Sequence, residues 1–140
     1  SFQEELTELK IRAIDEDWGF KDWDEMQKDP DVEVEDYIVF VGARCGGLYQ
    51  ARIETLKKYV NGSSLSFKLL AMNELIDKYS LDANTDIVTE QAQIWGYSKK
   101  HMYRRYYIEL YKFSMKHDFK LTTLVQDRKI CEKEYEKYFS

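Results

Sequence analysis

A chain of 140 residues is long enough to fold as one domain, or as two very small ones, around a hydrophobic core. Apolar residues make up 44% of it, and with one proline and six glycines it does not have the composition of a low-complexity disordered chain. The formal net charge of −5 argues against a strongly basic nucleic-acid binder, and no apolar run approaches the length of a membrane span.

Charge is distributed unevenly along the chain. Residues 1–36 hold 14 Asp or Glu against 4 Lys or Arg, a local balance of −10. Residues 37–140 hold 12 acidic against 17 basic side chains, a balance of +5. Because local potential rather than net charge steers a charged partner, either half could bind a partner of opposite sign.

The acidic first part begins with a predicted helix and continues with aromatic residues set among acids. Residues 2–14 carry apolar side chains at spacings of three to four, which is typical of an amphipathic helix. Trp18, Phe20 and Trp23 follow within the acidic segment 15–36. Such rings can dock a partner, and they can equally cap the core of their own domain, where large apolar side chains usually lie.

The clearest strand signal covers Val32 to Ala43, where valines alternate with acids and a β-branched and aromatic run follows. The glycines of ARCGG then predict a turn, and residues 48–56 fit either a second strand or a helix. We therefore expect an α+β fold, predominantly helical, with one β-hairpin or short sheet near residues 32–55.

We expect one compact domain over residues 1–140. Within it the sequence indicates three parts, which are the acidic segment 1–36, a hairpin region at 32–60 and a helical region at 63–140.

The hairpin segment EDYIVFVGARCGGLYQARIETL, around residues 36–56, resembles the opening of Tudor-like or bromo-adjacent-homology chromatin modules. This resemblance implies an aromatic cage that holds methylated lysine by cation–π attraction, with Trp18 and Trp23 as possible sources of rings.

Residues 86–117 contain a candidate helix-turn-helix. Ala92, Gly96 and Met102 have the spacing of a small residue at a helix crossing, a turn glycine and an apolar residue of the second helix. Ser98 can cap that second helix, along which Met102, Tyr106, Leu110 and Phe113 form a core stripe. The segment resembles generic helix-turn-helix and homeodomain-like modules, but it lacks the basic arm that precedes the first helix in the latter.

That resemblance implies nucleic-acid contact through the basic helix 98–116, with Arg104 as the base reader and the lysines on phosphate. The alternative is an ordinary amphipathic helix with a solvated basic face. The candidate nucleic-acid-binding residues are Lys99, Lys100, Tyr103, Arg104, Arg105, Lys112 and Lys116.

Cys45 and Cys131 form no spaced motif, so free thiols in an intracellular protein are the simplest prediction, with a single bridge as the alternative. Neither histidine has a spaced ligand partner, and the carboxylates lack the spacing of a calcium loop. We expect no metal, cofactor or catalytic site.

The sequence thus predicts a non-enzymatic binding module. Its first predicted function is that of a DNA- or chromatin-associated helix-turn-helix protein that contributes to transcription regulation and is intracellular, and nuclear if the source is eukaryotic. The alternative is a protein–protein adaptor that uses the acidic, Trp-rich segment 15–36 to dock a basic partner.

Overall fold

The computed structural model describes residues 2–15, 22–56, 62–80, 86–117 and 122–139. All regular secondary structure in these residues is α-helical, so the prediction of an α+β fold is wrong. The six helices are α1 (Phe2–Asp15), α2 (Trp23–Lys28), α3 (Val34–Leu56), α4 (Gly62–Ser80), α5 (Asp86–Lys116) and α6 (Thr122–Phe139). The helix predicted at 2–14 is confirmed, and the predicted helical region 63–140 contains α4, α5 and α6.

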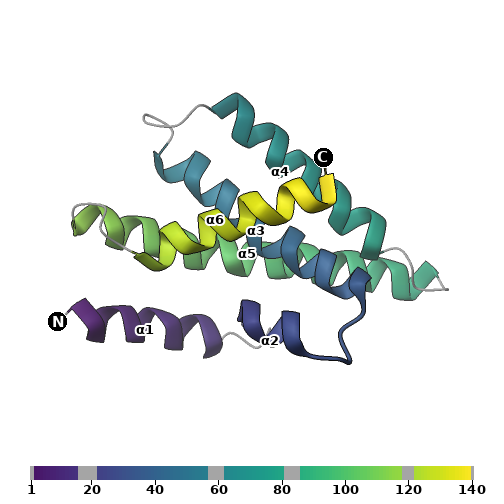
Figure 1. The fold of residues 1–140 in the computed structure, drawn as a ribbon, viewed down its shortest axis with the longest axis horizontal. Helices are drawn as coiled ribbons and strands as arrows, with labels where there is room; N and C mark the ends of the chain where they lie inside the picture. Colours follow the sequence, from purple (N-terminus) through teal and green to yellow (C-terminus); the bar gives the residue numbers. More distant parts are fainter. Residues whose placement is uncertain (1, 16–21, 57–61, 81–85, 118–121, 140) are drawn as a thin grey trace.

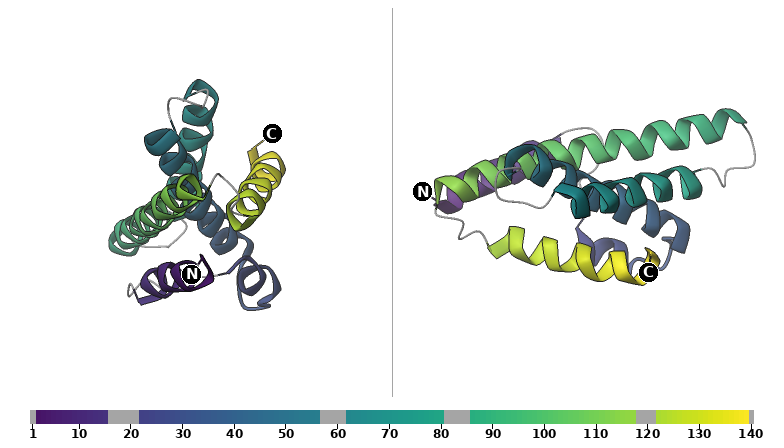
Figure 2. Two further views of the ribbon diagram at one scale, coloured as in Figure 1. Left: turned by 90° about the vertical axis from the view of Figure 1, so that its left-hand side faces the viewer. Right: turned by 90° about the horizontal axis from the view of Figure 1, so that it is seen from above.

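Helix α3 is the centre of the bundle. It packs mainly against α5 on one side and α4 on another, while α1 lies along α5 (Figure 1). Helix α6 lies across α3 and α5, and α2 is on the same side of the molecule as α6 (Figure 2, left). Buried side chains from all six helices belong to one hydrophobic cluster.

The hairpin predicted near residues 32–55 is a single helix, α3. Every residue from Ile38 to Tyr49 is buried, and apart from Arg44 and the Tyr49 hydroxyl the segment is apolar because it is covered on all sides. A short continuous apolar run has the same appearance in a buried strand and a buried helix, and here tertiary burial overrides β-propensity. The resemblance of this region to Tudor-like and bromo-adjacent-homology modules therefore loses the hairpin on which it was based.

The glycines of ARCGG allow close helix packing instead of forming a turn. A Cβ atom built on Gly47 would lie 2.6 Å from the backbone nitrogen of Arg104 and 2.8 Å from the carbonyl oxygen of Lys100. A Cβ on Gly42 would lie 3.2 Å from the carbonyl oxygen of Met72 in α4. These glycines let α3 approach both neighbouring helices more closely than larger residues would allow.

The helix-turn-helix predicted near residues 86–117 is also wrong as a statement about fold. The backbone is helical without interruption from Asp86 to Lys116, through Gly96 and Ser98. A glycine inside a helix costs only about 1 kcal/mol relative to alanine, which packing can offset. The predicted core stripe of α5 is confirmed, since Met102, Tyr106, Leu110 and Phe113 are all buried.

No helix in the described ranges combines the length and the apolar character needed to cross a membrane.

Candidate interaction surfaces

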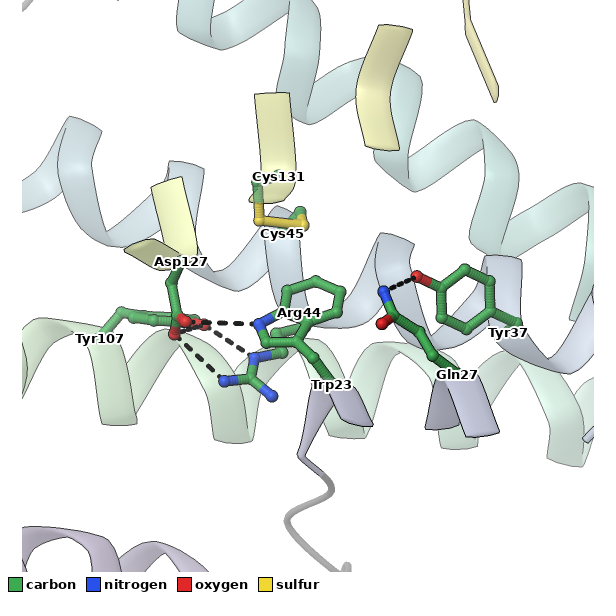
Figure 3. The surroundings of a disulfide bond; sticks show 8 residues. All are labelled: Trp23, Gln27, Tyr37, Arg44, Cys45, Tyr107, Asp127 and Cys131. Carbon is green, nitrogen blue, oxygen red and sulfur yellow. Dashed lines mark hydrogen bonds and ion pairs between the residues drawn. A yellow bond between two sulfur atoms is a disulfide. The ribbon is translucent and has the colours of Figure 1, made fainter. Parts of the chain in front are cut away.

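A buried polar network joins α2, α3, α5 and α6 (Figure 3). The Arg44 guanidinium forms an ion pair with Asp127, at 3.1 Å between Nη2 and Oδ2, and its Nε donates to the Tyr107 hydroxyl. The Tyr107 hydroxyl donates to Asp127 Oδ2 at 2.8 Å, and Trp23 Nε1 donates to Asp127 Oδ1 at 3.3 Å. Asp127 therefore accepts bonds from all three partners, which is how a buried carboxylate is stabilised.

The ionisation of this network is fixed by its own members. Burial alone would lower the pKa of Arg44, but Tyr107 and Asp127 outweigh it and the pKa of the guanidinium is raised. Burial also raises the pKa of the Tyr107 hydroxyl well above its ordinary value, although the neighbouring Arg44 opposes that shift. Arg44 is thus charged and Tyr107 neutral at any physiological pH. We interpret the network as a structural element that holds four helices together.

A disulfide between Cys45 and Cys131 lies beside the network and links α3 to α6 (Figure 3). Both cysteines are completely buried, and their Cα atoms are 5.6 Å apart. The prediction of free thiols is therefore wrong, and the single bridge left open by the sequence is present. Sequence spacing gave no signal for it, because the two cysteines are 86 residues apart and only the packing of α6 on α3 brings them together.

Three of the seven predicted nucleic-acid-binding residues are buried. Lys99 and Lys100 are each 8% exposed and Tyr103 is 1% exposed. The Lys100 ammonium donates to Asn73 Oδ1 of α4 at 2.9 Å, and Tyr103 packs edge-on against Phe40 of α3. The start of the basic sequence thus faces the interior of the bundle.

Acidic side chains neutralise other cations of this set. The guanidinium of Arg104 forms a two-point contact with Glu54 of α3, at 2.9 and 3.1 Å. The Lys116 ammonium lies 3.3 Å from Glu5 of α1. Arg105 and Lys112 are exposed. The seven residues therefore do not form one exposed face of α5.

Of the predicted partner-binding rings, the described part of the chain includes only Trp23; Trp18 and Phe20 lie outside the described residues. Trp23 is 8% exposed and packs edge-on against Phe40, with the Arg44 guanidinium 4.6 Å above its ring. This position agrees with the alternative that the sequence left open for these rings, in which they cap the core.

Eight acidic side chains lie on α2 and its N-cap, on the connection after it and at the start of α3, and they form what we call the acidic surface. All eight are exposed, and within the described residues none of them forms an ion pair. Lys28 is the one basic residue in this stretch. The acidic surface consists of Asp22, Asp24, Glu25, Asp29, Asp31, Glu33, Glu35 and Asp36.

The backbone that carries the acidic surface is anchored at both ends. Trp23 fixes the start of α2 to the core. At the start of α3, Gln27 donates to the Tyr37 hydroxyl at 3.1 Å, and the Tyr37 ring contacts Tyr138 of α6. Burial raises the pKa of Tyr37 to about 12, although the bond from Gln27 opposes the shift.

Helix α6 presents a second charged surface that sequence reasoning missed. Lys129, Lys133 and Lys137 are exposed along one face of it, beside the exposed Glu136, and we call these three lysines the basic row. Glu132 of the same helix pairs with Lys68 of α4. The four-residue spacing of the lysines was readable as a signal.

Among the described residues, no group of three or more His, Cys, Asp or Glu side chains could hold a metal ion. Comparisons of the chain with protein-family models, with curated proteins and with solved structures found no match.

Proposed function

We propose that the protein is a non-enzymatic binding domain that docks a basic protein partner on its acidic surface. The observation that carries this proposal is the set of eight exposed carboxylates with no ion pair in the described residues. Clustered charge of one sign accelerates encounter with a partner of opposite sign and selects against other partners.

The attachment of the acidic surface to the core supports this function. Because Trp23 and Tyr37 hold α2 and the start of α3, the carboxylates are presented on backbone that is already ordered. A preorganised surface loses less conformational entropy on binding than a segment that folds on its partner. The earlier alternative, in which the Trp side chain itself inserts into the partner, has less support because Trp23 is buried.

The experiment measures binding of a synthetic, lysine-rich helical peptide by fluorescence anisotropy. Replacing Asp31 with Asn and Glu33 with Gln should raise the Kd about fivefold, at roughly 0.5 kcal/mol for each exposed ion pair. The matched control, Glu8→Gln with Glu74→Gln, removes the same charge from exposed positions elsewhere. Equal losses in both variants would reduce the effect to net charge and contradict the proposal.

Nucleic-acid binding through α5 stays a prediction with a smaller set of residues. Of its seven residues, Arg105, Lys112 and Lys116 are exposed, with Lys116 beside Glu5, while Lys100 and Arg104 are engaged by Asn73 and Glu54. A gel-shift assay with random duplex at low salt tests it. Binding that falls steeply with salt and is lost in Arg105→Glu with Lys112→Glu would restore this function.

The disulfide favours an oxidising compartment over the predicted nuclear location, since such bonds persist mainly outside the cytosol and nucleus. Mass spectrometry of protein alkylated in denaturant at the moment of cell lysis tests this: unmodified cysteines would support an oxidising compartment, and two alkylated cysteines would contradict it.

A further inference from the structure

The outward face of α6 carries exposed lysines, with the exposed Glu136 among them. Lys129 and Lys133 are exposed, and neither has an ion pair or hydrogen bond there. Val125, 39% exposed, lies one turn before Lys129. The row from Lys129 to Lys137 is about 12 Å long at 1.5 Å per helical residue. This helix face combines positive charge with an exposed apolar side chain.

The acidic surface adjoins the basic row on the same side of the molecule. Trp23 of α2 bonds to Asp127 of α6, and Tyr37 of α3 contacts Tyr138 of α6 with ring centroids 6.2 Å apart. Figure 2 (left) shows α2 and α6 on one side of the bundle. The acidic surface also carries an exposed apolar side chain, Val34, at 62% exposure. Two neighbouring surfaces of opposite charge are therefore presented together.

We infer that the protein self-associates as a two-fold dimer in which the acidic surface of each copy docks on the basic row of the other. This inference rests on the proposed function and names its partner as a second copy of this chain. In a dimer whose two-fold axis passes between the two patches, the acidic surface of each copy faces the basic row of the other. The same contact between opposite charges therefore forms twice. Val34 and Val125 supply apolar surface at the two patches.

Charge exchange tests the arrangement. One variant, Asp31→Lys with Glu33→Lys, reverses two charges of the acidic surface, and the other, Lys129→Glu with Lys133→Glu, reverses two charges of the basic row, so the reversed charges face each other only in the mixed dimer. Each variant alone should sediment near 16.8 kDa, while wild type and an equal mixture of the variants should approach twice that mass at low salt. Wild type should return to the monomer mass at about 0.5 M salt, where the Debye length is only a few ångströms.

Three results would overturn the inference. The first is a monomeric wild type at about 0.5 mM protein in low salt, since millimolar affinity is the weakest association of interest. The second is a mixture of variants that stays monomeric. The third is a dimer that persists in both variants but is lost in Phe67→Ser with Leu70→Ser, which would assign the contact to the exposed apolar side chains of α4.

The peptide assay separates failure of this inference from failure of the proposed function. The assay is run at a protein concentration low enough for the wild type to be monomeric. If Asp31→Lys with Glu33→Lys loses peptide binding while wild type stays monomeric in sedimentation, the acidic surface binds a basic partner other than a second copy. If the variant retains full peptide binding, the proposed function fails as well.

Discussion

Helices α5 and α6 are attached to the central helix α3 by different means. The contact between α3 and α5 depends on shape, with Gly47 against the backbone of α5 and fully buried tyrosines such as Tyr107 around it. Among the α6 side chains whose burial is described, the fully or nearly buried apolar ones are Leu124 and Cys131. Helix α6 is held by a disulfide and by charged pairs. We therefore expect the stability of the α3–α5 contact to depend on side-chain volume, and that of the α3–α6 contact to depend on charge and redox state.

The largest expected effect comes from breaking the charged attachment of α6. Asp127→Ala leaves the Arg44 charge buried without its carboxylate and removes the acceptor of Trp23 Nε1. We expect a loss of about 3–5 kcal/mol in the free energy of unfolding, measured by urea denaturation. The control, Arg44→Met with Asp127→Leu, removes both charges and should lose less. A double variant as unstable as Asp127→Ala would show that the unpaired Arg44 charge is not the cause of the lost stability.

Removing the disulfide should have the next largest effect. Cys45→Ser with Cys131→Ser opens a cross-link between residues 86 positions apart, and we expect a loss of about 2–4 kcal/mol in stability. Hydrogen exchange should show the faster exchange mainly in α6, because the α3–α5 contact does not depend on the bond. Uniform acceleration in α3, α5 and α6 would contradict the contrast between the two attachments.

The α3–α5 contact should respond to one added methyl group. In Gly47→Ala the new Cβ would lie 2.6–2.8 Å from backbone atoms of α5, which move only with the whole helix. We expect a loss of about 1–3 kcal/mol despite the better helix propensity of alanine.

Gly46→Ala is the matched control for that change. Its Cβ would meet the flexible Lys100 side chain at 3.3 Å, and the lysine can shift. A Gly46→Ala protein that is destabilised as much as Gly47→Ala would show that the cost is not the close helix approach.

The smallest expected effect concerns α1, which is tied to the end of α5 at the surface. Hydrogen bonds from Lys116 and then His117 lower the pKa of the Glu5 carboxyl below its ordinary value of 4.5. A lowered folded-state pKa stabilises the protein above pH 4.5, and this contribution is lost as the pH falls through the folded-state pKa.

Urea midpoints above and below pH 4.5 measure the contribution of Glu5. Wild type should lose slightly more stability on acidification than Glu5→Gln, and the difference should be small because Glu5 is exposed at the surface. Parallel pH profiles of the two proteins would remove Glu5 as a source of pH dependence.

Part of the candidate site was readable from the sequence. The charge balance of −10 over the first 36 residues already predicted an acidic surface. The size and apolarity of the Trp23 side chain also indicated a core position as one alternative. The burial of Lys99 and Lys100 was not readable, because a lysine stem can cover apolar surface wherever an acceptor such as Asn73 is available. The basic row of α6 was visible in the four-residue spacing of its lysines.

By itself the sequence determined those helices whose apolar spacing is periodic, namely α1, α4, α6 and the core stripe of α5 from Met102 to Phe113. Tertiary structure decided the rest. Residues 34–56 became a helix because burial on every side removes the distinction between strand and helix periodicity. Packing also decided whether a glycine marks a turn or a close helix contact, and it brought Cys45 to Cys131 and Arg44 to Asp127. These are long-range contacts, and local sequence carries no signal for them.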